Sequence, residues 1–178
     1  MEIVFMLIRK MNENDVDQIA RLWSMLFIDQ TSRNEYINNK DVKYSSNDSL
    51  RNRYLDCYKN PNCEILVADL YGKVKGFIEV WLYKKDFYFD VDDYAYILHF
   101  FIEKDFKSEL SYINISLKLV RAAKEWAQQH NCKHLGCDVY GFNTNVQRWV
   151  EKLGFNPYKI RYMKKLENNQ QENNEKTT

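Results

Sequence analysis

Hydrophobic positions recur along this chain with two periods, one typical of helices and one of strands. A short apolar run predicts a first strand over residues 5–11, and apolar positions spaced by three and four then predict a helix over residues 12–30. A second helical pattern covers residues 48–60, where Asn60-Pro61 ends it. The polar, unpatterned residues 30–48 between the two helices are predicted to form a loop.

The middle of the chain follows the pattern of β-strands. Strands are predicted over residues 63–70 and 74–86, with a hairpin turn at Tyr71-Gly72-Lys73 between them. Residues 94–103, YAYILHFFIE, are too continuously apolar for a half-solvated strand, so they are expected to lie centrally in a sheet. Residues 113–129 then predict a helix with a wide apolar face, which suits packing flat on that sheet.

The last third of the chain predicts a strand over residues 132–140, a short helix over 145–153 and a final strand over 158–166. Gly154 follows the short helix, where a left-handed backbone commonly ends helices and lets the next residue, Phe155, pack back. Residues 167–178 contain no apolar residue and are predicted to be a disordered tail. We therefore expect one domain over residues 1–166, of α/β (α+β) class: a mixed, mostly antiparallel, twisted sheet with helices on both faces.

Charge and composition exclude several classes of protein. The formal net charge of +1 gives no global basic footprint for nucleic acid. The apolar N-terminal stretch, residues 3–8, is too short for a membrane span or a signal sequence, which predicts a cytoplasmic protein without a membrane partner. No C-x-x-C spacing occurs, so we expect reduced, buried or half-buried thiols and no metal site; the cysteines are Cys57, Cys63, Cys132 and Cys137.

Several short segments of the second half share a family pattern. They are Ala123 and Trp126-Ala127 at the end of the long helix, the segment NCKHLGCDV, Asn143, and the segment EKLGF. In these segments the chain resembles the GNAT superfamily of N-acetyltransferases, and the resemblance extends over nearly the whole chain up to Leu166. Cys137-Asp138 further resembles the aminoglycoside 6'-N-acetyltransferase subgroup. The resemblance implies a GNAT-like fold whose central strands splay near Phe101 to Glu103.

The resemblance also implies a function. It implies acetyl-coenzyme A as co-substrate and a small-molecule amine as acceptor, with an aminoglycoside-like amine among the candidates, and it leaves a homodimer open. The implied coenzyme contacts are the backbone of Phe101, Ile102 and Glu103, the phosphate loop at Ser111, Asn114 and Ser116, and Asn143.

The chain departs from the family at two points. The arginine and both glycines of the phosphate motif are absent from SYINIS, residues 111–116. Val150 stands where many members have a tyrosine that protonates the departing thiolate, which leaves Tyr140, Tyr158 or water as replacements. A non-catalytic module of the same fold, binding a ligand or a protein partner in the same cleft, is therefore the alternative function.

Acyl transfer to an amine requires a group that accepts the amine proton. His99, Glu103 and Asp138 lie on predicted strands near the expected cleft and are the candidates. An acidic run would suit docking of a polycationic amine, although a solvated acidic loop explains it equally; it comprises Asp86, Asp90, Asp92 and Asp93.

Overall fold

The computed structural model describes residues 6–33, 47–84, 93–103 and 109–164. Within it the chain forms two compact units, Met1–Thr144 and Asn145–Thr178, and each is described by itself. Most of the predicted loop at residues 30–48 and the whole predicted tail at 167–178 lie outside the described residues. The expected single domain over residues 1–166 stays a prediction.

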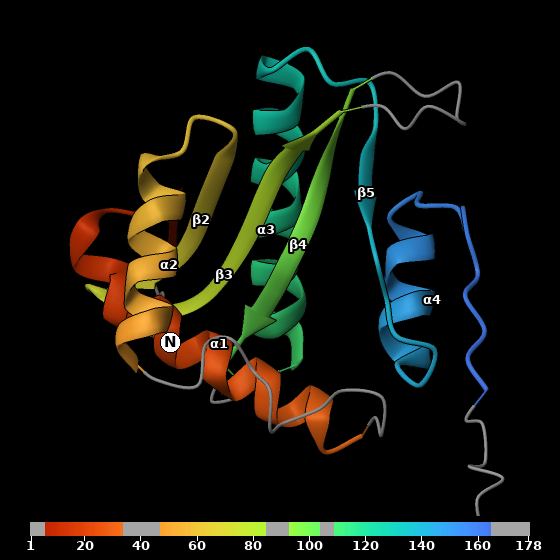
Figure 1. The fold of residues 1–178 in the computed structure, drawn as a ribbon, viewed down its shortest axis with the longest axis horizontal. Coiled ribbons are helices and arrows are strands. Elements are labelled where there is room, and N and C mark those ends of the chain that lie inside the picture. Colours follow the sequence, from red (N-terminus) through yellow and green to blue (C-terminus); the bar gives the residue numbers. More distant parts are fainter. Residues whose placement is uncertain (1–5, 34–46, 85–92, 104–108, 165–178) are drawn as a thin grey trace, which may run out of the picture. The chain divides into compact units, whose positions relative to one another are not determined.

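The first unit contains one five-stranded sheet with the strands in chain order (Figure 1). The first four strands pair antiparallel, and the fifth pairs parallel to the fourth. The predicted mixed, mostly antiparallel sheet is therefore confirmed. The strands are β1 (Met6–Lys10), β2 (Cys63–Leu70), β3 (Lys73–Tyr83), β4 (Tyr94–Ile102) and β5 (Leu135–Cys137).

Helices cover both faces of this sheet (Figure 1). Side chains of a strand alternate between faces. Ile65, Val67 and Phe77 belong to the core beneath α1 (Val16–Thr31) and α2 (Asn47–Lys59), while α3 (Glu109–Gln129) packs on the opposite face. Within the described residues, no helix combines the length and the apolar character that a membrane crossing requires.

The start of α1 is fixed by polar contacts of the residues before it. Asn12 accepts the N–H of Asn14 at 2.9 Å, and Asp15 accepts the N–H of Asn12 at 2.8 Å, which forms a capping box around a short 3-10 turn, η1 (Glu13–Asp15). The Arg9 guanidinium donates to both oxygens of Asp15, at 2.6 and 2.9 Å, and so joins β1 to this turn. The second helix ends at Lys59, two residues before Pro61, as predicted.

β4 and β5 pair only briefly. Residues 95–97 of β4 pair with residues 135–137 of β5, and beyond Ile97 the two strands diverge (Figure 1). β5 is thus shorter than the predicted residues 132–140, because only three of its residues have a ladder partner. Opposite β3, Glu79 faces His99 whereas Val80 faces Ile97, so β4 carries one extra residue at this point. The second half of β4 therefore has a strand partner on the β3 side and none from β5.

In the second unit, the short helix α4 (Thr144–Lys152) ends as predicted. Gly154 has a φ of +90°, and the Phe155 N–H donates to the Val150 carbonyl at 3.1 Å. The final strand predicted over residues 158–166 is wrong in its described part, because residues 158–164 form no strand. Its alternating apolar side chains, Tyr158, Ile160 and Tyr162, remain exposed, and an alternating pattern becomes a strand only when a partner strand pairs with it.

Candidate active site

A fully buried carboxylate, that of Glu79 on β3, organises one region of the first unit. One of its oxygens accepts from Arg53 at 2.5 Å and from the Trp81 indole at 2.7 Å, and the other lies 2.8 Å from Nδ1 of His99. Burial opposes ionisation, but the hydrogen bond from His99 and the charge and hydrogen bond of Arg53 lower the pKa of Glu79 to about 2. Glu79 is therefore a buried anion with several donors around it.

His99, a predicted proton acceptor, lies in this network. The Trp23 indole nitrogen lies 3.2 Å from Nε2 of His99, and an indole can only donate. Nε2 is then the acceptor, and Nδ1 carries the hydrogen that faces Glu79. Both ring nitrogens are thus engaged, which makes His99 a positioning residue between α1 and β3.

Glu103, the second predicted acceptor, directly follows β4. Its oxygens accept from Arg21 at 2.7 Å and from Lys75 at 2.6 Å. Burial acts to raise its pKa, but the hydrogen bonds and charges of Lys75 and Arg21 outweigh burial and lower it. A carboxylate neutralised by two cations is a weak base, so its main contribution is to fix the end of β4 to α1 and β3.

The alternation of N–H directions decides which main-chain donors at the end of β4 face its open side. The Glu103 N–H donates to the Lys75 carbonyl at 2.8 Å, so it faces β3. N–H directions alternate along a strand, so Phe101, which pairs with Phe77, faces β3 as well. The N–H of Ile102 therefore points to the side that β5 does not reach. Of the three predicted backbone contacts, Ile102 is the one suited to donate to a ligand carbonyl.

Asp138, the third predicted acceptor, directly follows β5 and is exposed. The Tyr96 hydroxyl on β4 is hydrogen-bonded to it, and burial together with this hydrogen bond raises the pKa of Tyr96. The rings of Tyr83 and Tyr94 surround Tyr96, with centroid distances of 5.0 Å from Tyr83 and 6.5 Å from Tyr94. Asp138 is thus oriented by a strand residue on the segment where β4 and β5 still pair.

The predicted phosphate-loop residues all lie inside α3, which begins at Glu109. The first four N–H groups of a helix have no helical acceptor, and in α3 these are the N–H groups of residues 109–112, which include Ser111. Asn114 lies beyond them with an exposed side chain, and Ser116 is buried and donates its hydroxyl to the Tyr112 carbonyl at 2.8 Å. Ser116 is consequently not placed to contact a phosphate.

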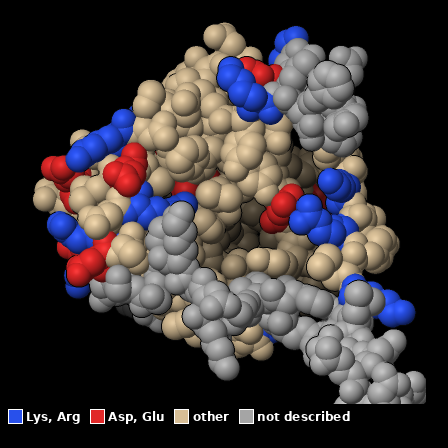
Figure 2. Space-filling model, viewed as in Figure 1, with Lys and Arg blue, Asp and Glu red and all other residues tan. Residues whose placement is uncertain are grey.

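The remaining predicted contacts are peripheral or outside the described residues. Asn143 immediately precedes α4, and its N–H donates to the Tyr140 carbonyl at 2.9 Å. Asp86, Asp90 and Asp92 lie outside the described residues, while Asp93 is exposed and pairs with Lys84 at 2.6 Å. On the face shown in Figure 2, described basic and acidic side chains are interspersed and form no continuous basic surface.

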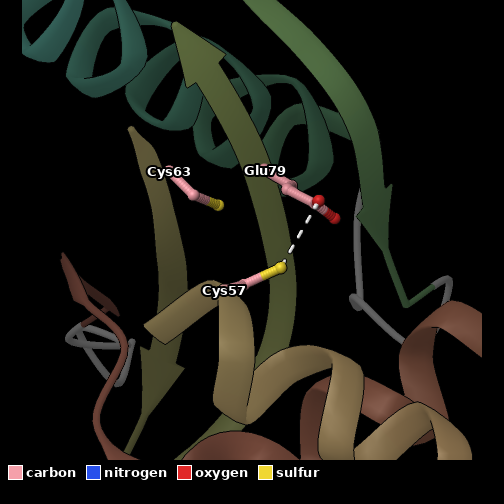
Figure 3. A group of neighbouring side chains, drawn as sticks. All are labelled: Cys57, Cys63 and Glu79. Carbon is pink, nitrogen blue, oxygen red and sulfur yellow. Dashed lines mark hydrogen bonds between the residues drawn. The ribbon is translucent and has the colours of Figure 1, made fainter. Parts of the chain in front are cut away.

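The fold also brings together residues that sequence reasoning left apart. Cys57 on α2, Cys63 at the start of β2 and Glu79 on β3 are all buried, with their donor atoms within 4.8 Å of one another (Figure 3). The prediction of buried or half-buried free thiols is confirmed for all four cysteines. Glu79 was missed because its pattern is that of any strand residue; the one available signal was a charged residue inside the apolar run of residues 77–82.

A four-stranded antiparallel sheet, extended by one parallel strand that soon diverges and crossed by a helix, defines an acetyltransferase-like fold. Residues 26–155 match the model of the Acetyltransferase (GNAT) family, and the chain belongs to that family. No curated protein matches it in sequence.

Solved structures share the fold at low identity. The aminoglycoside N-acetyltransferase AAC(6')-Iy in complex with CoA has a TM-score of 0.71 at 16% identity, over 90% of this chain and 95% of that one. The aminoglycoside 6'-N-acetyltransferase AAC(6')-Ih from Acinetobacter baumannii has 0.67 at 16%, over 92% and 100%. A transcriptional regulator from Bacillus halodurans has 0.68 at 18%, over 91% and 100%. At these identities the likeness concerns the fold.

Proposed function

We propose that the protein transfers an acetyl group from acetyl-coenzyme A to a small amine, with aminoglycoside-like amines as the first class to test. The observation that carries this proposal is the open side of β4 beyond Ile97, where β5 has diverged and no strand among the described residues pairs with Ile102 on that side. Together with family membership, an unpaired strand edge next to a helix N-terminus suits a long ligand that carries both amides and phosphates.

The residues present fit this co-substrate in part. Ile102 would donate to the thioester carbonyl, and the N–H groups at the start of α3, including Ser111, would face the phosphates. Asn114 and Asn143 remain proposed side-chain contacts. Acetyl-coenzyme A supplies the activated acetyl group. The chain must bind the amine, stabilise the thioester carbonyl oxygen and move the protons.

Asp138 is the proposed group for handling the amine. Transfer forms a C–N bond and breaks the C–S bond, so one proton must leave the amine and one must reach the thiolate. A carboxylate beside the amine attracts its ammonium form and also raises the amine pKa. Asp138 therefore needs water to carry the proton onward, and the Tyr96 hydroxyl holds its carboxylate in place.

The second candidate is a non-catalytic module. It is favoured by the missing glycines of residues 111–116 and by the placement of Ser116 inside α3. The two functions separate in one assay: the protein is titrated with acetyl-coenzyme A, and acetylation is then followed by mass spectrometry with aminoglycosides, linear polyamines and peptide amines. Coenzyme binding followed by acetylation of an amine supports the enzyme, and absence of coenzyme binding at millimolar concentration supports the module.

A further inference from the structure

We propose that Cys57, Cys63 and Glu79 form a binding site for one thiophilic divalent ion of the zinc class. The two thiolates and one carboxylate oxygen would be its protein ligands. The site lies between α2, β2 and β3 (Figure 3) and is separate from the proposed acetyl-transfer site at the open side of β4.

The positions of the donor atoms suit a single ion. The Cys57 sulfur lies 4.0 Å from the nearer Glu79 oxygen, and all three donor atoms lie within 4.8 Å of one another. A tetrahedral ion at about 2.3 Å from sulfur and about 2.1 Å from oxygen separates its ligands by about 3.6–3.8 Å. Side-chain torsions that move the atoms by about 1 Å or less would therefore close the site.

Charge favours exchange of the thiol protons for an ion. Without an ion, the buried cluster contains the Glu79 anion, the Arg53 cation and two neutral thiols, which gives a net charge of zero. Replacing two thiol protons by one divalent ion leaves that net charge at zero. The buried groups thus bind the ion without adding an uncompensated charge to the interior, which would otherwise be costly.

Glu79 retains the capacity to bind an ion. A carboxylate offers about four lone-pair positions. In the described structure Arg53, Trp81 and the Cys57 thiol donate to one oxygen and His99 lies at the other, and exchange of the Cys57 proton for an ion would open the position that this thiol occupies. Arg53, Trp81 and His99 would remain as donors. These three donors would also hold the carboxylate in position, as the hydrogen-bond partners of metal ligands do.

A second observation points to a ligand at the same place. The Tyr54 side chain is completely buried, and its hydroxyl has no hydrogen-bond partner in the described structure. Tyr54 lies on α2, one turn before Cys57, and its hydroxyl would be available to donate to a thiolate or to a water in the fourth coordination position.

An entry route exists beside the two thiols. A cavity of about 340 Å³ is lined by Cys57 and Cys63 together with Lys10, Trp126 and His130. Each thiol thus borders both the buried carboxylate and a space large enough for water. A hydrated ion can therefore lose its water in steps as it reaches the donors.

The test uses the full-length, reduced protein after treatment with a chelator. Titration with Co²⁺ is expected to give one ion per chain, with a thiolate-to-cobalt charge-transfer absorption and the visible bands of tetrahedral coordination. X-ray absorption at the zinc edge on the wild type loaded with Zn²⁺ is expected to show two sulfur neighbours. Because it needs no variant, this measurement decides the proposal even if substitutions impair folding.

Variants assign the ligands. Cys57→Ser and Cys63→Ser should each lower the charge-transfer absorption at saturation to roughly half and weaken binding by about tenfold or more. Cys132→Ser, which replaces a half-buried cysteine outside the cluster, should bind as the wild type does. The proposal is overturned by a reduced wild type that binds no stoichiometric ion, by zinc without sulfur neighbours, or by an unchanged band in Cys57→Ser. It is also overturned if the protein holds a Cys57–Cys63 disulfide after mild reduction, seen as a lower intact mass.

Discussion

At the scale of single residues, three carboxylate side chains lie in different environments. Glu79 is buried among donors, Glu103 is bound by two cations, and Asp138 is exposed with a tyrosine hydroxyl as partner. Of the three, Asp138 alone combines solvent access with a neutral partner. This difference, which the sequence does not contain, makes Asp138 the preferred group for the amine.

Asp138→Asn keeps the shape of the side chain and removes its charge. We expect turnover with an accepted amine to fall by on the order of 100-fold or more, since acid–base groups contribute at least that much, while coenzyme affinity changes little. Tyr96→Phe should give a smaller fall. Asp17→Asn, at an exposed carboxylate that pairs with Arg51 at 3.0 Å, serves as the control. Turnover at the wild-type rate in Asp138→Asn across pH 6–9 would make Asp138 structural.

Glu79 should dominate the acid sensitivity of the fold. Its pKa is depressed from 4.5 to about 2, so its contribution to stability is present above pH 4.5 and is lost as pH falls through 2. That shift corresponds to about 3 kcal/mol. Glu79→Gln should therefore destabilise the protein at pH 7 by about 3–5 kcal/mol, because Arg53 loses its partner.

The same variant should flatten the dependence of unfolding free energy on pH between 4.5 and 2, measured by urea unfolding. Glu125→Gln, at an exposed carboxylate on α3, is the matched control and should change stability by about 0.5 kcal/mol or less. An equally steep acid dependence in Glu79→Gln and the wild type would contradict this role.

At the scale of elements, the hairpin of β3 and β4 determines where the open edge lies. A methyl group at Gly76 would come within 2.9 Å of the Ile102 side chain and 3.0 Å of the Phe101 carbonyl. The close approach of β3 to the end of β4 thus requires glycine at this position. The Ile102 N–H is held by this packing rather than by a loop.

Gly76→Ala should therefore reduce stability by about 1–3 kcal/mol, as overpacking does, and should also weaken binding of acetyl-coenzyme A by moving the end of β4. Gly141→Ala is the control, because its added methyl group meets no atom within 4 Å. Thermal unfolding and coenzyme titration measure the two effects. If Gly76→Ala is measurably destabilised but binds acetyl-coenzyme A with unchanged affinity, the packing at Gly76 does not position the coenzyme site, and this prediction is wrong.

The sequence predicts most elements of the first unit, and the failures have physical causes. The strand over residues 63–70 and the turn after it follow from local pattern, and both are found: Tyr71 and Gly72 have φ values of 52° and 82°. β5 was predicted too long, and the final strand was predicted where the described residues 158–164 form none, because pairing, not pattern, decides where a strand forms and ends. The Glu79 network was invisible because its partners lie 20 and 26 residues away in sequence.

At the scale of the whole molecule, the central claim is that this member of the GNAT family is a working acetyltransferase despite its altered phosphate motif. Saturating acetyl-coenzyme A, at a hundred times its dissociation constant, should stabilise the fold by about 2.7 kcal/mol. A thermal-unfolding series with rising coenzyme concentration checks this, with Gly141→Ala measured in parallel as a folded control. Binding alone would be shared by a non-catalytic module, so it does not decide the claim.

The most direct test follows the acetyl group itself. The protein is incubated with isotope-labelled acetyl-coenzyme A and the amine panel, and labelled acetylated amine is quantified by mass spectrometry against Asp138→Asn and a protein-free control. The account predicts labelled product from at least one amine, formed catalytically by the wild type and on the order of 100-fold more slowly by Asp138→Asn. Coenzyme binding at saturation without labelled product from any amine class would contradict it and assign the fold to a binding role.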